Sequence, residues 1–454
     1  MINITVQKEA NLYNVYHMTK AFYPFLEIQQ KVDEKASHFV TIEIVGEKIL
    51  TFDSMEKHKF DKMLYQSLCQ HSGRKLAWGT LLGVRPTKLV TRAIEEGKTK
   101  EKVIEELRED RYVSEGKATL AYEIAMREEA ILRPLDYENG YSLYIGIPFC
   151  PSICSYCSFS SGVYDIYKEM ISDYIDTLEK EMQDVAEHLR DKKLNTIYIG
   201  GGTPTALKEQ ELCRVLELIK KYFPLGDLLE YTIEAGRPDS ITPEKLDIIK
   251  EHPVSRLSIN PQTMQQKTLD AIGRNHTIDQ IYSTYERARE KGFSNINMDL
   301  ILGLPGEELT DVKDTFAKIK TLAPDSLTVH TLAIKRASRL MQIETPGQTI
   351  EDMIHISQIT AKEMNLLPYY LYRQKNIGGN FENIGYSKVD KAGIYNILIM
   401  EEKQSIIACG AGATTKQRLK EKVIYKGKET NLIRTDNVKD IKQYIKRGAT
   451  EKWR

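Results

Sequence analysis

The alternation of strand-like and helix-like segments between residues 141 and 333 constrains the fold more than any other feature of this sequence. Helical patterns separate successive apolar, strand-like runs, which indicates a parallel sheet covered by helices. Six such units fit an incomplete α/β barrel better than a closed eight-fold one, and the open side leaves a gap for a large, flat substrate. The expected strands are 141–149, 196–200, 231–235, 256–261, 296–302 and 326–333, and the expected helices are 167–189, 207–222, 243–252, 279–291 and 309–322.

The segments on either side of this barrel have different patterns. Residues 1–135 are expected to form a separate α/β module, in which we find no catalytic constellation. The barrel is assigned to 136–338, and 339–454 is expected to form a C-terminal α+β domain that covers the barrel opening. Within the flanking parts we expect strands at 1–7, 38–52, 395–401 and 405–409, a turn at 45–47, and helices at 59–71 and 101–132.

Composition excludes several classes of protein. The 454 residues contain 64 lysines and arginines and 64 aspartates and glutamates, which argues against a general nucleic-acid binder. The N-terminus has no signal-peptide pattern, and no apolar run approaches the ~20 residues needed to span a membrane. Six cysteines are too few for a disulfide scaffold in a chain of this length. The protein is therefore expected to be cytoplasmic and to have no membrane span.

Three of the cysteines lie together as C-x3-C-x2-C, at Cys150, Cys154 and Cys157. The loop follows the first barrel strand, and reactive sites in parallel α/β folds form at the carboxyl ends of strands. Three thiolates can hold three irons of a cubane cluster, which leaves the fourth iron free to bind a small molecule. A zinc site with a remote fourth ligand and a disulfide-exchange pair at Cys154 and Cys157 are the alternatives.

A second motif, Ile199-Gly-Gly-Gly-Thr-Pro204, ends the second predicted strand. Glycines at such a position let the backbone approach a ligand closely, and their amide and carbonyl groups can pair with a polar cofactor. Further polar residues stand at or just beyond the later strands, where burial is costly unless they meet a ligand. These are Glu234, Gln262, Arg274 and Asp299.

Together these motifs resemble the radical S-adenosylmethionine (radical SAM) superfamily. The stretches 144–150, 256–259, 272–277 and 299–306 are similar to the branch of oxygen-independent coproporphyrinogen III oxidase-like proteins. The stretches 83–88, 369–376 and 395–402 resemble the HemZ subgroup of that branch, so the resemblance spans nearly the whole chain.

The resemblance implies a [4Fe–4S] cluster on Cys150, Cys154 and Cys157 and one or two molecules of S-adenosylmethionine (SAM). Reduced flavodoxin or ferredoxin would supply the electron that converts SAM into methionine and a 5′-deoxyadenosyl radical. By the same resemblance, the residues that contact SAM are Tyr144, Tyr156, Gly201, Gly202, Thr203, Glu234, Gln262, Arg274, Asp299 and Ala333.

The family also implies a tetrapyrrole substrate, with oxidative decarboxylation of coproporphyrinogen III to protoporphyrinogen IX as the expected reaction. Substrate propionates call for cations that pair with carboxylates. The candidates are Lys335, Arg336, Arg339 and Arg373, with solvated surface charge as the alternative interpretation.

The sequence departs from the oxidase at two positions. Phe159 stands where the oxidase has a further cysteine, and Gly146 stands where it has a histidine. A haem-binding chaperone of the HemW type is therefore a rival interpretation, and a radical enzyme that opens or alkylates haem is a third. That chaperone group carries an H-N-x-x-Y-W motif, and the comparable stretch here has Glu382 in place of the histidine and Ser387 in place of the tryptophan.

Overall fold

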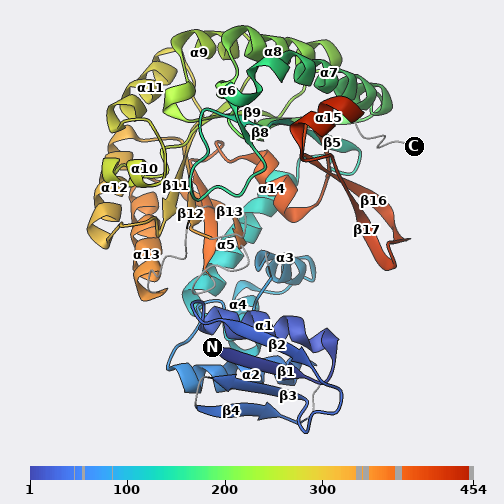
Figure 1. Cartoon of the computed structure of the whole chain (residues 1–454), viewed down its shortest axis with the longest axis vertical. Coiled ribbons are helices and arrows are strands. Elements are labelled where there is room, and N and C mark those ends of the chain that lie inside the picture. The colour runs from blue at the N-terminus through green and yellow to red at the C-terminus, as the bar shows by residue number, and fades with distance from the viewer. Residues whose placement is uncertain are drawn as a thin grey trace.

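The computed structural model describes residues 1–44, 47–53, 57–83, 85–333, 340, 347–373 and 381–448. Figure 1 shows an arc of helices around a curved sheet, with the N-terminal segment as a smaller unit at one end. The expected α/β class and partial barrel are confirmed by this architecture.

The N-terminal segment consists of a four-stranded sheet and five helices, and it contains two different packing environments. The sheet has the order β2-β1-β3-β4 and packs with α1 and α2 into its own apolar core, whereas Trp78 and helices α3 to α5 share the core of the barrel. The expected strands and the helix expected at 59–71 are present, but the helix expected at 101–132 is divided into two, because Tyr112 adopts a left-handed backbone that ends the first of them. Residues 45 and 46 of the expected turn lie outside the described residues. The elements are β1 (Ile2–Val6), α1 (Glu9–Phe22), β2 (Ile28–Val32), β3 (Val40–Ile44), β4 (Glu47–Phe52), α2 (Lys57–Ser72), α3 (Thr87–Glu95), α4 (Lys100–Arg111) and α5 (Glu115–Leu132).

All of the predicted barrel strands and helices are confirmed, with shifted ends. The strands pair in parallel in the order β12-β11-β10-β9-β8-β5, as right-handed βα units require. They are β5 (Gly140–Ile147), β8 (Lys193–Gly201), β9 (Glu230–Gly236), β10 (Arg256–Ile259), β11 (Ile296–Leu302) and β12 (Ser326–Thr331). The outer helices are α7 (Ile171–His188), α8 (Glu209–Tyr222), α9 (Pro243–Lys250), α11 (Ile278–Glu290) and α12 (Leu309–Leu322), and the shorter elements are β6 (Phe149–Cys150), β7 (Gly162–Val163), α6 (Tyr164–Tyr167) and α10 (Gln266–Ala271).

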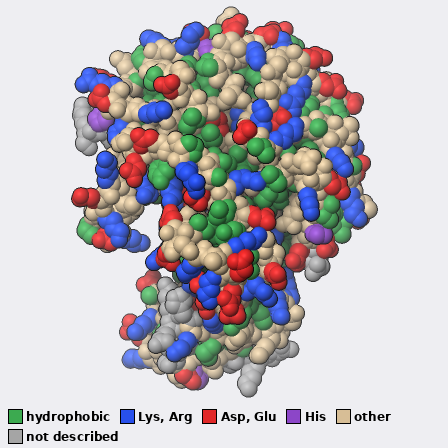
Figure 2. Space-filling model, turned by 180° about the vertical axis from the view of Figure 1, so that it is seen from behind, with side chains coloured by type: hydrophobic (Ala, Val, Ile, Leu, Met, Phe, Trp, Pro, Cys, Tyr) green, Lys and Arg blue, Asp and Glu red, His purple; other side chains and the backbone are tan. Residues whose placement is uncertain are grey.

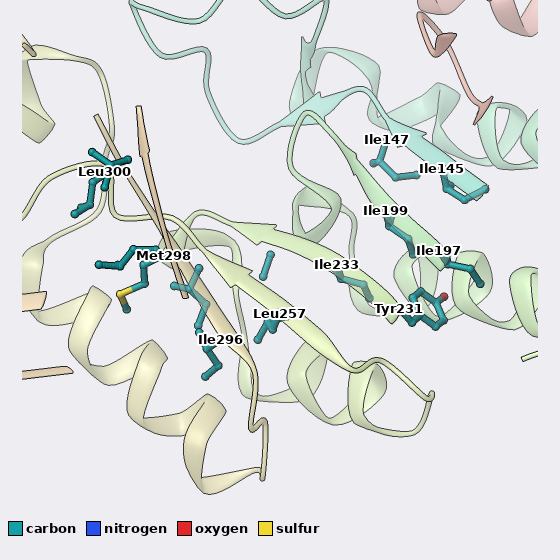
Figure 3. Packing of buried hydrophobic residues seen from close by; sticks show 14 of the residues in the cluster. Ile145, Ile147, Ile197, Ile199, Tyr231, Ile233, Leu257, Ile296, Met298 and Leu300 are labelled. Carbon is teal, nitrogen blue, oxygen red and sulfur yellow. The ribbon is translucent and has the colours of Figure 1, made fainter. Parts of the chain in front are cut away.

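Side chains alternate along each barrel strand between the helical layer and the barrel interior. Figure 3 shows the apolar set that packs toward the helices, which includes Ile145, Ile197, Ile233, Leu257 and Met298. The residues between them point inward and include many polar groups. The strands are thus apolar on one face only, and the interior differs from the packed core of a closed barrel.

The C-terminal segments extend this sheet at both edges. Strands β13 and β14 continue it antiparallel beyond β12, while β15 pairs in parallel with β5 and leads into the β16–β17 hairpin. The expected strand at 405–409 is confirmed as β15, but the expected strand at 395–401 is wrong, because this segment forms helix α14. The elements are α13 (Gly347–Glu363), β13 (Leu367–Arg373), β14 (Glu382–Ser387), α14 (Ile394–Glu401), β15 (Ser405–Cys409), β16 (Thr414–Tyr425), β17 (Lys428–Asp436) and α15 (Ile441–Arg447).

The surface carries charges of both signs. On the face shown in Figure 2, basic and acidic side chains are interspersed over the barrel and the N-terminal unit. Within the described part of the chain, every helix is too short or too polar to cross a membrane.

Candidate active site

The cysteine loop begins where β5 ends, and it is held by contacts from neighbouring loops. Cys150 ends the short strand β6, and the backbone N–H of Cys157 donates to the carbonyl of Cys154 at 3.1 Å. Arg237 donates to the hydroxyl of Ser152 at 2.7 Å, and the N–H of Ser155 donates to the carbonyl of Ile272 at 3.0 Å. The loop therefore has a defined shape that the protein itself supports.

The glycine motif after β8 lies directly against this loop. The N–H groups of Gly202 and Thr203 donate to the carbonyls of Ile147 and Phe149 at 2.8 and 2.7 Å. A Cβ atom at Gly202 would lie 2.5 Å from the Phe149 carbonyl oxygen, so no larger residue fits there without movement. The close approach that Gly202 permits is thus to the backbone of the cysteine loop.

The loop and the glycine motif border a cavity of about 600 Å³ inside the barrel. Every residue predicted to hold the cluster or to contact SAM lines this one cavity. Lys335, Arg336 and Arg339 lie outside the described residues. Arg373 is described, but it does not line the cavity: its guanidinium donates to the carbonyl of Leu81 at 2.5 Å and lies 5.7 Å from the ring of Trp78.

Two carboxylates on inward-facing positions of the barrel have opposite electrostatic environments. Burial raises the pKa of Glu234 to about 7, with a further increase from Asp299, although the hydroxyl of Tyr198 donates a hydrogen bond to this carboxylate. Burial acts in the same direction on Asp299, but hydrogen bonding and charge from His330 and a 2.7 Å hydrogen bond from Asn297 lower its pKa overall. The cavity therefore holds one carboxylate that binds a proton near neutral pH beside one that stays ionised.

Aromatic side chains form part of the cavity wall, which we call the aromatic wall. The rings of Tyr198 and Tyr395 stack with centroids 4.5 Å apart, and Tyr144 lies 6.2 Å from Tyr198. Tyr372 also lines the cavity, and its hydroxyl lies 3.2 Å from Nδ1 of His330. Flat, apolar rings with a few polar groups are typical of sites for organic ligands.

Helix α14 carries part of this wall, and charged residues hold both of its ends. The buried carboxylate of Glu230 accepts hydrogen bonds from the backbone N–H groups of Ile394 and Tyr395 at 2.5 and 3.4 Å. At the other end, Arg85 donates to the carbonyl of Met400 at 2.7 Å. Arg85 of the N-terminal segment thus contacts the helix that forms part of the cavity wall.

Sequence reasoning missed several lining residues, namely Tyr198, Arg256, His330, Tyr372, Tyr395 and Met400. Those on barrel strands could have been found from the two-residue alternation, since Tyr198 lies between Ile197 and Ile199, and Arg256 and His330 each have an apolar neighbour that packs outward. The residues of α14 could not, because the segment was predicted to be a strand.

Glu382, at the position that the chaperone motif assigns to histidine, lies in a different setting. Its carboxylate accepts a hydrogen bond from Nε1 of Trp78 at 2.7 Å and forms a buried ion pair with Lys117. Glu382 does not line the cavity. The residue that replaces the histidine therefore joins the N-terminal segment to β14.

Comparisons with known proteins now identify the class. The sequence model described as Radical SAM superfamily matches residues 144–319, which include the cysteine loop and five of the barrel strands. "Oxygen-independent coproporphyrinogen-III oxidase-like protein HemZ" of Bacillus subtilis (strain 168) is 41% identical over 385 residues, which covers 81% of this chain and 77% of that protein. Fold and site define a radical SAM protein. Within that superfamily, the chain belongs to the family of oxygen-independent coproporphyrinogen III oxidase-like proteins.

Two other relatives mark the range of this family. "Heme chaperone HemW" of Bacillus subtilis (strain 168) is 40% identical over 195 residues, or 43% of this chain and 51% of that protein. The solved structure of HemN from Escherichia coli, described as a coproporphyrinogen III oxidase and radical SAM enzyme, has a TM-score of 0.54 at 24% identity. It covers 70% of this chain and 72% of HemN, and this likeness shows the shared fold.

The superfamily uses a [4Fe–4S] cluster and SAM, and the residues of this site fit both. In the described part of the chain, no three His, Cys, Asp or Glu side chains converge as ligands of one metal ion would. The thiolates of a cubane cluster bind separate irons, so three cluster ligands need not converge on one point. Two buried atoms, Oε1 of Gln262 and Nε of Arg274, have no hydrogen-bond partner among the described residues and are available to a polar cofactor in the same cavity.

Proposed function

We propose that this protein is a cytoplasmic, anaerobic radical SAM enzyme that decarboxylates coproporphyrinogen III oxidatively to protoporphyrinogen IX. The observation that carries the proposal is the shared cavity, which is lined both by the predicted cluster and SAM residues and by the aromatic wall. The relative that covers most of the chain is named as a coproporphyrinogen oxidase-like protein, which supports a tetrapyrrole substrate.

In this proposal the three cysteines bind three irons of the cluster, and reduced flavodoxin or ferredoxin supplies electrons. SAM, when bound, supplies a 5′-deoxyadenosyl radical that removes a hydrogen atom from a substrate propionate. The chain's own groups bind and orient the cofactor: the backbone of residues 201–203 and the side chains of Gln262 and Arg274 would hold its polar parts. Glu234 is itself positioned by the hydrogen bond that the hydroxyl of Tyr198 donates to it. Each of two propionates would lose a hydrogen atom to the radical, carbon dioxide, and one further electron to a separate one-electron acceptor, and would become a vinyl group.

A haem chaperone of the HemW type is the second candidate. The 40% identity with HemW and the presence of Phe159 in place of a further cysteine favour it. The ion pair between Glu382 and Lys117 favours the enzyme. Glu382 stands where the chaperone motif has a histidine, so the histidine of that motif is replaced by a residue that pairs with the N-terminal segment. An enzyme that opens or modifies haem would share the cluster and SAM and differ in its product.

The test is anaerobic reconstitution of the cluster, followed by reduction and addition of SAM and coproporphyrinogen III. Loss of two carboxyl groups, measured by mass spectrometry, is the expected result. Release of 5′-deoxyadenosine without a porphyrinogen product would indicate a different substrate, and stoichiometric haem binding without turnover would indicate the chaperone. Cys154→Ala should lower the iron content and abolish SAM cleavage, whereas the matched control Cys213→Ala should retain both.

A further inference from the structure

Arg256 is a buried cation whose hydrogen-bonding capacity is mostly unused. It begins β10 and lines the cavity, although only 1% of its surface is exposed. In the described chain its one hydrogen bond runs from Nη2 to the hydroxyl of Ser326 at 3.2 Å, and its buried Nε has no partner. A guanidinium has five N–H donors, and a buried donor without an acceptor lowers stability.

The other two arginines that line the cavity are satisfied differently. Arg237 pairs with both oxygens of Asp239, at 3.0 and 2.7 Å. Arg274 donates to the carbonyl of Asn260 at 2.6 Å and to the hydroxyl of Tyr156 at 3.1 Å. Among these three, Arg256 alone has neither a carboxylate nor a carbonyl acceptor within the described chain.

The acidic group near Arg256, Glu230, does not accept hydrogen bonds from its guanidinium. Glu230 contributes charge at Arg256, but its oxygens accept from the backbone at the start of α14 and from Thr232 at 2.9 Å. The two side chains do not form an ion pair within 4 Å. Arg256 therefore remains a fixed, desolvated cation that faces the cavity.

Arg256 lies on the inner side of the cavity, level with tyrosines of β8 and β5 and near Glu234. The register of the parallel strands aligns Arg256 with Thr232, Tyr198 and Tyr144, so it lies below the strand ends from which the cysteine loop leaves. Tyr198, Tyr370 and Tyr395 line the same cavity, which places aromatic surface near the cation. A flat ring that carries a carboxylate on a short side chain would satisfy both features, since guanidinium and carboxylate pair bidentately.

We propose that Arg256 is the substrate-binding residue that anchors one carboxylate side chain of the tetrapyrrole at the inner end of the cavity. This inference rests on the proposed function for the identity of the ring. It assigns carboxylate recognition to a barrel strand, whereas the cations expected from the sequence lie outside the described residues or away from the cavity.

The test compares two stable porphyrins, coproporphyrin III and its tetramethyl ester, which differ in carboxylate charge. Binding to the full-length protein without its cluster is followed by porphyrin fluorescence, so no turnover is needed. Wild type is expected to bind the tetra-acid about tenfold or more tightly than the ester, as a charged hydrogen-bonded pair implies. Arg256→Gln should abolish this preference, and Arg256→Lys should retain part of it, because lysine keeps the charge and loses the bidentate geometry.

Controls separate the role of Arg256 from general damage to the fold. Arg214→Gln, on the outer surface of α8, should behave as wild type, and Ser326→Ala should keep the preference because the cation remains. If Arg256→Gln does not fold, Arg256→Lys carries the comparison. A preference for the tetra-acid that is unchanged in the Arg256 variants would overturn the inference and leave the proposed function intact. If wild type binds neither porphyrin, the proposed function fails, and the inference fails with it.

Discussion

Replacing Glu234 by glutamine should stabilise the protein without its cofactors, and increasingly so as the pH rises. The side chain is partly buried at an inward-facing position of β9, and its pKa rises from an ordinary 4.5 to about 7. At pH values below 4.5 both the folded and the unfolded chain bind the proton, so the carboxyl costs nothing. Between 4.5 and 7 the unfolded chain ionises first, and folding is progressively penalised.

The magnitude follows from this difference in pKa. At about 1.4 kcal/mol per pH unit, the full penalty is about 3 kcal/mol, reached above pH 7. Glutamine has nearly the same shape, carries no charge, and can still accept the hydrogen bond that Tyr198 donates. Glu234→Gln should therefore raise the free energy of unfolding by about 1 kcal/mol near pH 5 and by about 3 kcal/mol near pH 8.

Urea unfolding of the cluster-free protein at both pH values, in parallel with the exposed control Glu187→Gln on α7, measures the effect. A stabilisation that is equal at the two pH values, or a loss of stability at both, would refute the reasoning, because it would mean that water reaches the carboxylate. The predicted result would show that Glu234 lowers the stability of the folded protein near neutral pH, which suggests that the residue is needed for function. A buried carboxyl poised near neutral pH is typical of functional sites.

Two further predictions concern packing and a buried charge. Gly202→Ala should lower stability by about 1–3 kcal/mol, because the new Cβ would meet the Phe149 carbonyl at 2.5 Å. Reduced iron incorporation and a lower melting temperature would show it, while Gly226→Ala, with no atom within 4 Å of the new Cβ, should change neither. Lys117→Met should cost about 3–5 kcal/mol, because it leaves the Glu382 carboxylate buried without its cation. In denaturant melts the double variant with Glu382→Gln should lose less than the sum of the single changes, and strict additivity would contradict the pairing.

The cluster ligands and the barrel could be predicted from the sequence because both depend on local patterns. Cys150, Cys154 and Cys157 lie within one loop, so their spacing is visible in the sequence. Each strand or helix of the barrel shows its own pattern of apolar residues, which does not depend on distant parts of the chain. The strand predicted at 395–401 was wrong because a short apolar run fits a buried strand and a buried helix equally well, so the local pattern does not distinguish them. The carboxylate of Glu230, distant in sequence, holds the start of the helix that forms there.

The pairing of strands that are far apart in the sequence could not be predicted from local patterns. Nothing local in 405–409 shows that it joins the far edge of the sheet beside β5, while β13 and β14 join the opposite edge. Arg373 illustrates the consequence for site prediction. Its place in a tyrosine-rich strand suggested a substrate contact, but the strand carries it toward Trp78 and the Leu81 carbonyl.

The alternation of polar and apolar residues along the later barrel strands is a signal in the sequence that indicates the barrel interior more directly than the motifs do. Parallel strands buried on both faces read as continuous apolar runs. In β10, Arg256 and Ser258 alternate with Leu257 and Ile259, and β11 and β12 alternate in the same way. Helices cover the outer face of these strands, so polar residues at every second position must line the interior. The alternation thus predicts a barrel whose interior is a binding cavity, and it marks Arg256, which was not among the predicted contacts, as part of the lining.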